Sequence, residues 1–442
     1  MSSEPILRQA KGRPLLGELR LPGDKSISHR ALMLGSLAAG TSFVRSLGTG
    51  HDVQTTAACL RQLGVSVAGD QTGVKVRGRL EGDTLSGPLF IEPVAPLDCG
   101  NSGTTMRLLL GLLAGSPGFT VLTGDQSLSA RPMRRVTGPL ATMGARFWGR
   151  QNASLPPLAV LGASLCPATH EIPVASAQVK SALLLAGLRT EGLTSVTGPA
   201  ASRDHTERML AAMGADVRQP NPHTVAILGP ARLEPLDLVV PGDPSSAAFW
   251  VAAALLVPGS HIRLCGVSLN PGRLGLVHVL QRSGARIEVR PTGEAAGEPV
   301  GDLEVRYSEL RPISVAPQEV PALIDEIPLL GLLATAAGGE SRLCGLAELR
   351  HKETDRLACL VQGLRALGAA ASEQGDDVSV TGPTPLRAPA TPLASQGDHR
   401  MAMTWAVAAL LTTGETAIQD GAAVAVSYPA FWSDLARLTG GL

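Results

Sequence analysis

The chain has 442 residues, with 38 basic and 38 acidic side chains and a formal net charge of zero. This balance excludes the diffuse attraction to nucleic acid that a basic protein shows, and an aromatic content of 3% leaves few platforms for stacking bases. The length exceeds what one hydrophobic core usually contains, so two domains are expected. Nucleic acid is therefore not expected as a partner.

The predicted elements repeat six times along the chain. In each repeat a short polar cluster, rich in Gly, Ser, Asp, Lys or Arg, precedes an unbroken apolar run that ends on glycine and leads into a strand. In chain order, the clusters are residues 24–30, 100–107, 176–180, 242–246, 325–328 and 397–401. Because the runs are apolar on nearly every face, each predicts a helix that is covered on all sides.

Glycines mark the ends of the predicted helices. Those that end the apolar runs recur roughly every 65 to 80 residues, a period that indicates structural repeats. They are Gly40, Gly115, Gly192, Gly259, Gly339 and Gly414. In most repeats a second helix, apolar on one face, ends on a further glycine and is followed by strands. Six such repeats predict an α/β fold of two similar domains with three repeats each.

Two short sequences predict where the chain crosses between the domains. Residues 21–24 (LPGD) and 240–244 (VPGDP) are similar and are punctuated by proline and glycine. If both are crossings, the N-terminal strand packs with the C-terminal half of the chain. We therefore predict one domain from residues 1–24 and 240–442, and a second from residues 25–239.

Cysteine spacing and hydropathy together predict the cellular compartment in which the protein acts. The six cysteines show no CxxC spacing, and a chain of this length needs no disulfides, so we expect reduced thiols in the core. The N-terminal segment MSSEPILRQAKGRPLLG lacks the apolar core of a signal peptide. No apolar stretch reaches the roughly 18 residues that a membrane helix needs. A cytoplasmic protein without membrane attachment is expected.

Cationic side chains gather at the predicted helix starts. They are Lys25, Arg30, Arg107, Arg131, Arg203, Lys352, Arg356 and Arg400. The helix dipole alone would favour acidic residues there. Helix N–H groups and guanidinium groups both suit phosphate and carboxylate, so the pattern predicts a cleft in which several helix ends hold a polyanionic substrate. Taken singly, each residue could equally be a solvated side chain at a helix end.

Eight motifs together resemble the 5-enolpyruvylshikimate-3-phosphate synthase family. They are LPGDKSISHRAL, DCGNSGTTMRLL, SARPM, SAQVKSALLLAG, SRDHTERML, LIDEIP, KETDRL and GDHRMAM. The resemblance implies two domains, each of three β-α-β-α-β-β units, with the ligand cleft between them. It implies transfer of the enolpyruvyl group from phosphoenolpyruvate to the 5-hydroxyl of shikimate 3-phosphate, with release of phosphate, in the shikimate pathway to chorismate and aromatic amino acids. It also implies that the enzyme uses no metal and no organic cofactor. We expect a monomer.

By this resemblance, one set of residues binds shikimate 3-phosphate. The set is Lys25, Ser26, Arg30, Ser176, Ala177, Gln178, Ser202, Arg203, Asp325 and Lys352. Ala177 stands where many family members have a second serine, so only its backbone is carried over as a contact.

A second set is implied to bind phosphoenolpyruvate. It is Lys25, Asn101, Gly103, Thr104, Arg131, Gln178, Glu353, Arg356 and Arg400. Gly103 permits close approach of a ligand to the backbone. The reaction protonates the methylene carbon of phosphoenolpyruvate and removes the hydroxyl proton, so the site must supply and accept protons. Lys25, Asp325 and Glu353 are the catalytic candidates: Asp325 takes the hydroxyl proton, and Glu353 with Lys25 handles the methyl proton.

Local explanations compete with some of these roles. Asp325 precedes an apolar helix and could be its N-cap. Glu353 could belong to a first-turn charge cluster with Lys352 and Arg356. Val426 occupies a position where some family members have a lysine that contacts phosphoenolpyruvate, so that contact is absent or replaced here.

Two other functions stay open as alternatives. UDP-N-acetylglucosamine enolpyruvyl transferases share the fold and the donor, but they usually have a cysteine five residues before the arginine that corresponds to Arg131, where this chain has Gln126. A non-catalytic protein that binds phosphate ligands would lose the carboxylates for proton transfer, whereas Asp325 and Glu353 are both present.

Overall fold

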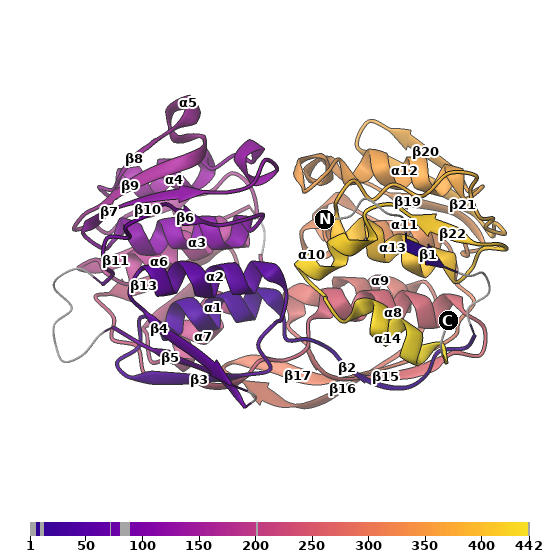
Figure 1. The fold of residues 1–442 in the computed structure, drawn as a ribbon, viewed down its shortest axis with the longest axis horizontal. Coiled ribbons are helices and arrows are strands. Elements are labelled where there is room, and N and C mark those ends of the chain that lie inside the picture. The colour runs from indigo at the N-terminus through magenta and orange to yellow at the C-terminus, as the bar shows by residue number, and fades with distance from the viewer. Residues whose placement is uncertain (1–5, 9–12, 71, 80–88, 200–201, 441–442) are drawn as a thin grey trace. The chain divides into compact units, whose positions relative to one another are not determined.

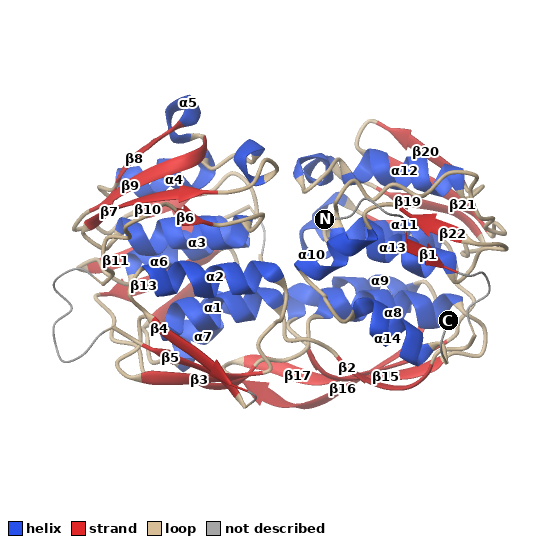
Figure 2. Cartoon of the chain, in the orientation of Figure 1, coloured by secondary structure: helices blue, strands red, loops and turns tan. Residues whose placement is uncertain are grey.

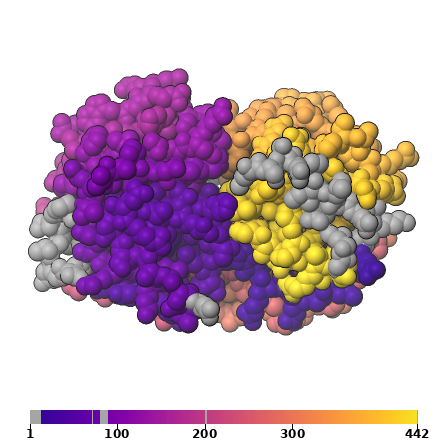
Figure 3. All heavy atoms as spheres, in the orientation of Figure 1, coloured from indigo at the N-terminus to yellow at the C-terminus, as the bar shows by residue number. Residues whose placement is uncertain are grey.

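The chain divides into two compact units. Unit 1 comprises Met1–Pro22, Pro241–Gly293 and Pro299–Leu442, and unit 2 comprises Gly23–Val240 and Glu294–Glu298 (Figures 1 and 3). The computed structural model describes residues 6–8, 13–70, 72–79, 89–199 and 202–440. Each unit has a hydrophobic core of its own.

Unit 2 contains three four-stranded sheets of the same topology (Figure 2). In strand order they are β14 (Asp237–Val239), β3 (Thr41–Arg45), β5 (Gly73–Arg77) and β4 (Ser66–Asp70); β6 (Leu97–Asp98), β7 (Gly118–Thr123), β9 (Leu155–Gly162) and β8 (Arg146–Gly149); and β10 (Thr169–Glu171), β11 (Gly192–Thr197), β13 (Thr224–Gly229) and β12 (Val217–Asn221). In each sheet the first two strands are parallel and the remaining neighbours are antiparallel. The helices are α1 (Lys25–Gly35), α2 (His51–Gln62), α3 (Gly103–Ala114), η1 (Leu128–Ala130), α4 (Arg134–Thr142), α5 (Arg150–Ala153), α6 (Ala177–Gly187) and α7 (His205–Ala212).

Unit 1 contains two four-stranded sheets and one two-stranded sheet. They are β2 (Leu16–Arg20), β15 (His261–Ser268), β17 (Glu298–Arg306) and β16 (Arg286–Ala295); β18 (Ser314–Val315), β19 (Gly339–Leu343), β21 (Asp377–Gly382) and β20 (Ala370–Gln374); and β1 (Ile6–Arg8) with β22 (Thr416–Ile418). The helices are α8 (Pro244–Leu256), η2 (Pro271–Arg273), α9 (Gly275–Arg282), η3 (Pro317–Glu319), α10 (Val320–Leu323), α11 (Ile327–Ala334), η4 (Ala347–His351), α12 (Arg356–Ala366), α13 (His399–Ala409), η5 (Gly421–Val426) and α14 (Phe431–Leu438).

The first helix of each repeat is buried, as its apolar sequence predicts. Every residue of α11 and α13 is buried, and so is every residue of α8 from Ser245 to Leu256. The second helices are amphipathic, and α9 buries only its apolar face. These features confirm the predicted α/β class and its repeats. Within the described ranges, no helix is both long and apolar enough to cross a bilayer.

The first strands of two repeats come from segments next to the crossings. β2 precedes the crossing at Pro22 and pairs in parallel with β15, so that Leu19 lies opposite Leu264. β14 precedes the crossing at Val240 and pairs in parallel with β3. The two similar sequences LPGD and VPGDP therefore each join a parallel strand to the start of a buried helix.

The sixth repeat differs from the predicted pattern. Its described strands are the antiparallel pair of β1 and β22, and Leu393 adds an isolated parallel bridge to Ile418. The chain after β22 forms η5 and α14 instead of further strands, because Phe431 and Leu435 are spaced for one face of a helix and both are buried.

The second repeat divides between two glycines the roles that the sequence assigned to one, because Gly115 ends α3 as predicted but the strand begins three residues later. Gly118, not Gly115, leads into the strand of the second repeat. Gly118 has a φ of 142°, close to the 133° of Gly192 and the 125° of Gly339, whereas Gly115 has a φ of −91° and ends α3. The left-handed backbone at the strand entrance is what requires glycine there.

The six cysteines are free thiols, but the prediction that all of them lie in the core was wrong. Cys59, Cys99 and Cys359 are buried. Cys166 is exposed between β9 and β10, and Cys265 and Cys344 are half-buried. Strand alternation explains Cys265, which follows the fully buried Leu264 on β15 and so points to the opposite face.

Candidate active site

Candidate residues of unit 2 lie at the starts of three buried helices, α1, α3 and α6 (Figure 1). A side-chain oxygen caps each helix by accepting a hydrogen bond from a first-turn N–H group. The caps are Asp24, Ser102 and Ser176, with bonds of 2.8, 3.1 and 3.5 Å. The first helical residues are Lys25, Gly103 and Ala177. These residues therefore stand at the positive ends of the helix dipoles, where an anion is favoured.

Lys25 forms an ion pair with Asp52. Its Nζ lies 3.0 Å from Oδ2 of Asp52, which belongs to the first turn of α2. The Lys25 side chain is 21% exposed, so the ammonium group keeps access to solvent. His29, one turn along α1, is fully buried; burial, followed by the charges of Lys25 and Arg30, holds its pKa well below the ordinary value. The positive charge of this part of α1 is thus carried by Lys25 and Arg30.

Side chains of α3 and α6 are joined by hydrogen bonds. Arg107 Nη1 donates to Gln178 Oε1 at 2.5 Å, and Gln178 Nε2 donates to Thr104 Oγ1 at 2.9 Å. Beside them, Arg131 Nη2 donates to Asn101 Oδ1 at 2.8 Å. The structure therefore brings together Asn101, Thr104 and Gln178 with two guanidinium groups.

Arg30 is held deep inside unit 2, with 3% of its surface exposed. Its Nε donates to Thr206 Oγ1 at 2.6 Å, its Nη2 to Ser181 Oγ at 2.7 Å and its Nη1 to the carbonyl of Ser26 at 2.9 Å. Burial lowers the pKa of Arg30 to about 10, although carboxylates including Glu207 act in the opposite direction. The guanidinium is fixed mainly by groups without full charge, so its positive charge remains effective.

The segment before α7 carries Ser202 and Arg203. The carbonyl of Ser202 accepts a hydrogen bond from Lys180 Nζ at 3.2 Å, and the same ammonium pairs with Glu207 at 2.5 Å. Arg203 is half-buried. The first turn of α7 is therefore connected both to α6 through Lys180 and to α1 through Thr206 and Arg30.

The candidates of unit 1 surround one buried arginine. Arg356 is the first residue of α12 and is 1% exposed. Its Nε donates to Asp398 Oδ2 at 2.7 Å and its Nη2 to Glu353 Oε2 at 2.6 Å, while its Nη1 lies 3.5 Å from Asp325 Oδ1. Burial opposes the charged form, but these carboxylates outweigh it and raise the pKa of Arg356 above its ordinary value. Arg356 is therefore a permanent buried cation.

Asp325 lies between two arginines and does not cap α11. The N-cap position of α11 is Glu326, whose side chain makes no cap bond. Asp325 Oδ1 is 3.5 Å from Arg356 Nη1 and 3.6 Å from Arg400 Nε, and Arg400 Nη1 also donates to the Asp325 carbonyl at 3.5 Å. The geometry therefore replaces the helix-cap explanation with a carboxylate shared by two cations.

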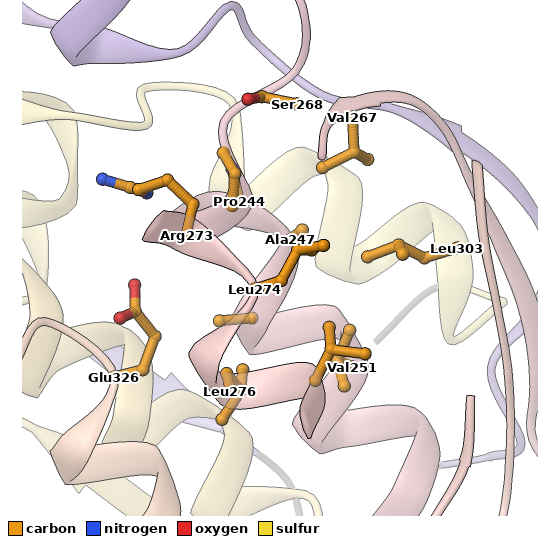
Figure 4. A pocket seen from close by; sticks show the side chains of 12 residues that line it. Pro244, Ala247, Val251, Val267, Ser268, Arg273, Leu274, Leu276, Leu303 and Glu326 are labelled. Atoms are coloured by element: carbon orange, nitrogen blue, oxygen red, sulfur yellow. The ribbon is translucent and has the colours of Figure 1, made fainter. Parts of the chain in front are cut away.

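The residue after Asp325 is anchored in a pocket of unit 1 (Figure 4). Glu326 Oε1 accepts from Ser245 Oγ at 2.5 Å, and Ser245 Oγ accepts from Arg273 Nη2 at 2.6 Å. Arg273 Nη2 also donates to Asp243 Oδ1 at 3.0 Å. These buried bonds tie the turn that carries Asp325 to the first turn of α8.

Asp398 belongs to this site and was missed from the sequence. Its Oδ1 accepts from the backbone N–H groups of Arg400 and Met401 and caps α13, while its Oδ2 binds Arg356. An aspartate before a helix predicts the cap. No local pattern shows that the second oxygen faces an arginine 42 residues away.

The predicted site residues thus form two sets, one in each unit. Besides the pairs above, Lys352 and Arg203 are half-buried, and Ser26 contributes its carbonyl to Arg30. Val426 lies half-buried in η5 and offers no charge to an anion.

Removing Asp398 should cost much more stability than removing a simple cap. In Asp398→Ala, a buried guanidinium loses a charged partner, so we expect the free energy of unfolding of unit 1 to fall by about 3 kcal/mol or more. The control is Asp355→Ala, which removes the 3.0 Å cap bond of α12 and a solvent-exposed ion pair with Arg350 from a side chain that is 40% exposed, and it should cost about 1 kcal/mol. Urea denaturation measures both values, and equal losses would contradict the buried ion-pair role.

A family model, known relatives and solved structures all indicate the same family. A family model described as EPSP synthase (3-phosphoshikimate 1-carboxyvinyltransferase) matches residues 9–435. A 3-phosphoshikimate 1-carboxyvinyltransferase from Synechococcus sp. (strain RCC307) is 51% identical over 434 residues, which cover 97% of this chain and 98% of that protein. A protein of the same name from Roseiflexus sp. (strain RS-1) is 48% identical over 428 residues, covering 96% and 97%.

Solved structures of similar fold agree with this family. The EPSP synthase of Acinetobacter baumannii has a TM-score of 0.85 and 37% identity, covering 98% of this chain and 97% of that chain. The enolpyruvyl transferase NikO from Streptomyces tendae, 21% identical, shares the fold with a TM-score of 0.79, covering 99% and 98%. The family model and the relatives span nearly the whole sequence, so the chain belongs to the EPSP synthase (3-phosphoshikimate 1-carboxyvinyltransferase) family.

Proposed function

We propose that two sets of residues, one in each unit, carry out the reaction of this enzyme family. The enzyme is a 3-phosphoshikimate 1-carboxyvinyltransferase of aromatic amino-acid biosynthesis. It transfers the enolpyruvyl group of phosphoenolpyruvate to shikimate 3-phosphate. The observation that carries the residue assignment is the position of Asp325 between Arg356 and Arg400. A monomer that acts in the cytoplasm, without metal or organic cofactor, remains our prediction from the sequence.

The unit 2 residues suit the phosphate and hydroxyl groups of shikimate 3-phosphate. Lys25 offers a partly exposed ammonium group, and Arg30 is pre-oriented by three internal hydrogen bonds. Arg203 and Ser202 precede α7, and Ser176, Ala177 and Gln178 form the start of α6. The first N–H groups of a helix have no partner within the helix, so the backbone of Ala177 can donate where other family members use a serine hydroxyl.

The arginines of unit 1 suit the acidic groups of phosphoenolpyruvate. Among the described residues, Nη1 of Arg356 is buried and has no hydrogen-bond partner, although Asp325 lies 3.5 Å away. Arg400 is 8% exposed and contacts the same carboxylate. A bound carboxylate or phosphate would supply the missing acceptor. Arg131, fixed by Asn101, and the α3 start at Gly103 and Thr104 are assigned to the same substrate.

Proton transfer is assigned to Asp325, Glu353 and Lys25. A proton adds to the methylene carbon of phosphoenolpyruvate and leaves C2 cationic; the 5-hydroxyl oxygen bonds to C2, and its proton passes to Asp325. The methyl group of the tetrahedral intermediate then loses a proton, the C2–O bond to phosphate breaks, and the double bond returns. Glu353, close to Arg356, and Lys25 are the groups proposed to give and take the methyl proton.

Arg356 and Arg400 hold the carboxylate of Asp325 in place for this step, because Arg356 Nη1 lies 3.5 Å and Arg400 Nε 3.6 Å from Asp325 Oδ1. An anionic donor bound by the same two arginines would lie next to Asp325. This proximity supports the assignment of Asp325 as the group that takes the hydroxyl proton.

The direct test is release of inorganic phosphate from phosphoenolpyruvate, with shikimate 3-phosphate as acceptor and UDP-N-acetylglucosamine in a parallel reaction. We expect release only with shikimate 3-phosphate. Release only with the nucleotide sugar would assign the chain to the other acceptor. Release with neither would favour a binding protein without turnover.

Asp325→Asn should separate catalysis from binding. The amide keeps the shape of the side chain but cannot take a proton, so we expect kcat to fall by about 10² or more. Binding of shikimate 3-phosphate, measured by calorimetry without the donor, should change little. A variant that retains kcat would reject Asp325 as the base.

Gly103→Ala should act on the donor. A Cβ atom at Gly103 would lie 2.9 Å from Arg107 Nη1, so that guanidinium must shift, and it would come into contact with Arg131 Nη1 at 3.4 Å. We expect the KM for phosphoenolpyruvate to rise several-fold while the KM for shikimate 3-phosphate stays within about twofold. An unchanged KM for phosphoenolpyruvate would remove Gly103 from the donor subsite. The control is Gly338→Ala, whose nearest neighbour is the Leu310 carbonyl at 4.0 Å.

A further inference from the structure

The tip of one hairpin belongs to a different unit from its strands. β16 and β17 lie in the sheet of β15 and β2 in unit 1 (Figure 1). Residues Glu294–Glu298 nevertheless belong to unit 2. Ala295 and Ala296 pack against the core of unit 2. Ala296 and Gly297 have φ values of 49° and 79°, as a tight two-residue hairpin turn requires. The tip is therefore a built part of unit 2.

A buried hydrogen bond joins this tip to α7. His205 Nδ1 lies 2.6 Å from Glu298 Oε1, and both side chains are 0% exposed. Arg208, one turn along α7, donates from Nη1 to the Gly297 carbonyl at 2.9 Å. A Cβ atom at Gly297 would lie 3.2 Å from Cβ of Arg208, so the hairpin backbone approaches α7 closely. A fully buried polar group is costly unless it is hydrogen-bonded, so this contact is specific rather than incidental.

The helix turn that receives Glu298 also serves the shikimate 3-phosphate residues. His205 is the first residue of α7, and only Asp204 separates it from Ser202 and Arg203 in the chain. The next residue, Thr206, accepts the Nε–H of Arg30 and contacts Ser181. Glu298 is also among the carboxylates that oppose the burial-induced lowering of the Arg30 pKa. One turn of helix thus joins the hairpin tip to three proposed contacts of the acceptor.

We propose that Glu298 is a positioning residue for the acceptor subsite: through His205 it fixes the first turn of α7, and so the places of Ser202, Arg203 and Arg30. This inference rests on the proposed function of those three residues. Glu298 does not touch the substrate. Loss of its contact should therefore weaken binding of shikimate 3-phosphate and leave the chemical step and the donor subsite unchanged.

The same strand supplies a matched control. Glu304 on β17 also pairs with a histidine, His261, at 2.8 Å, but the His261 side chain is 47% exposed and both residues lie in unit 1. Steady-state phosphate release is measured for wild type, Glu298→Ala, Glu298→Gln, Glu304→Ala and Glu304→Gln. Shikimate 3-phosphate and phosphoenolpyruvate are varied in turn.

We expect Glu298→Ala to raise the KM for shikimate 3-phosphate about tenfold, with kcat and the KM for phosphoenolpyruvate within about twofold. Glu298→Gln keeps an oxygen opposite His205, so it should raise that KM less, about threefold. Both Glu304 variants should match wild type. If Glu298→Ala does not fold, Glu298→Gln decides the question.

Three outcomes would overturn the inference: a wild-type KM for shikimate 3-phosphate in Glu298→Gln, a loss confined to kcat, or an equal effect of the Glu304 variants. An inactive wild type would instead defeat the proposed function. The two failures are therefore distinguishable.

Discussion

Burial of the first helix of every repeat is the constraint on which the structure depends. A helix covered on all sides can keep polar groups only at its ends, where backbone N–H groups lack partners within the helix. In this chain those ends carry caps such as Asp24, Ser102 and Asp398, and the candidate ligand-binding residues follow them directly. The core and the candidate site are therefore consequences of one arrangement, since the helices that fill each unit also present the N-termini that we propose bind anions.

The two units stabilise buried arginines in different ways. In unit 1, Arg356 is surrounded by carboxylates, which keep it charged and hold it in one orientation. In unit 2, Arg30 is oriented by the hydroxyl groups of Thr206 and Ser181, which do not neutralise its charge. The first arrangement couples cations to groups that can transfer protons, while the second preserves a positive field for a phosphate. This difference suits a reaction that needs both proton transfer and the binding of two phosphate esters.

Neither unit is built from one continuous segment. β2, near the N-terminus, completes a sheet of unit 1, and β14, just before the chain returns to unit 1, completes a sheet of unit 2. The tip of the β16–β17 hairpin also belongs to unit 2, although its strands lie in a sheet of unit 1. Two of these segments lead to a helix start that carries candidate site residues: Lys25 follows the first crossing, and Glu298 contacts His205 at the start of α7. The chain connections thus determine the order of the strands and also which residues lie next to the helix starts.

The sequence by itself determined the repeat, the buried helices and the residues next to the helix starts, because apolar periodicity, caps and glycines act over a few residues. The family followed from the resemblance of eight motifs. It failed where the outcome depends on distant partners. The carboxylate of Asp325 looked like a helix cap, and only tertiary structure placed it between two arginines. Asp398 and Glu298 gave no local sign of a second role, since their partners lie 42 and 93 residues away. The cysteine prediction failed for the same reason, because the exposure of a small side chain is decided by which face of a strand or loop the rest of the fold covers.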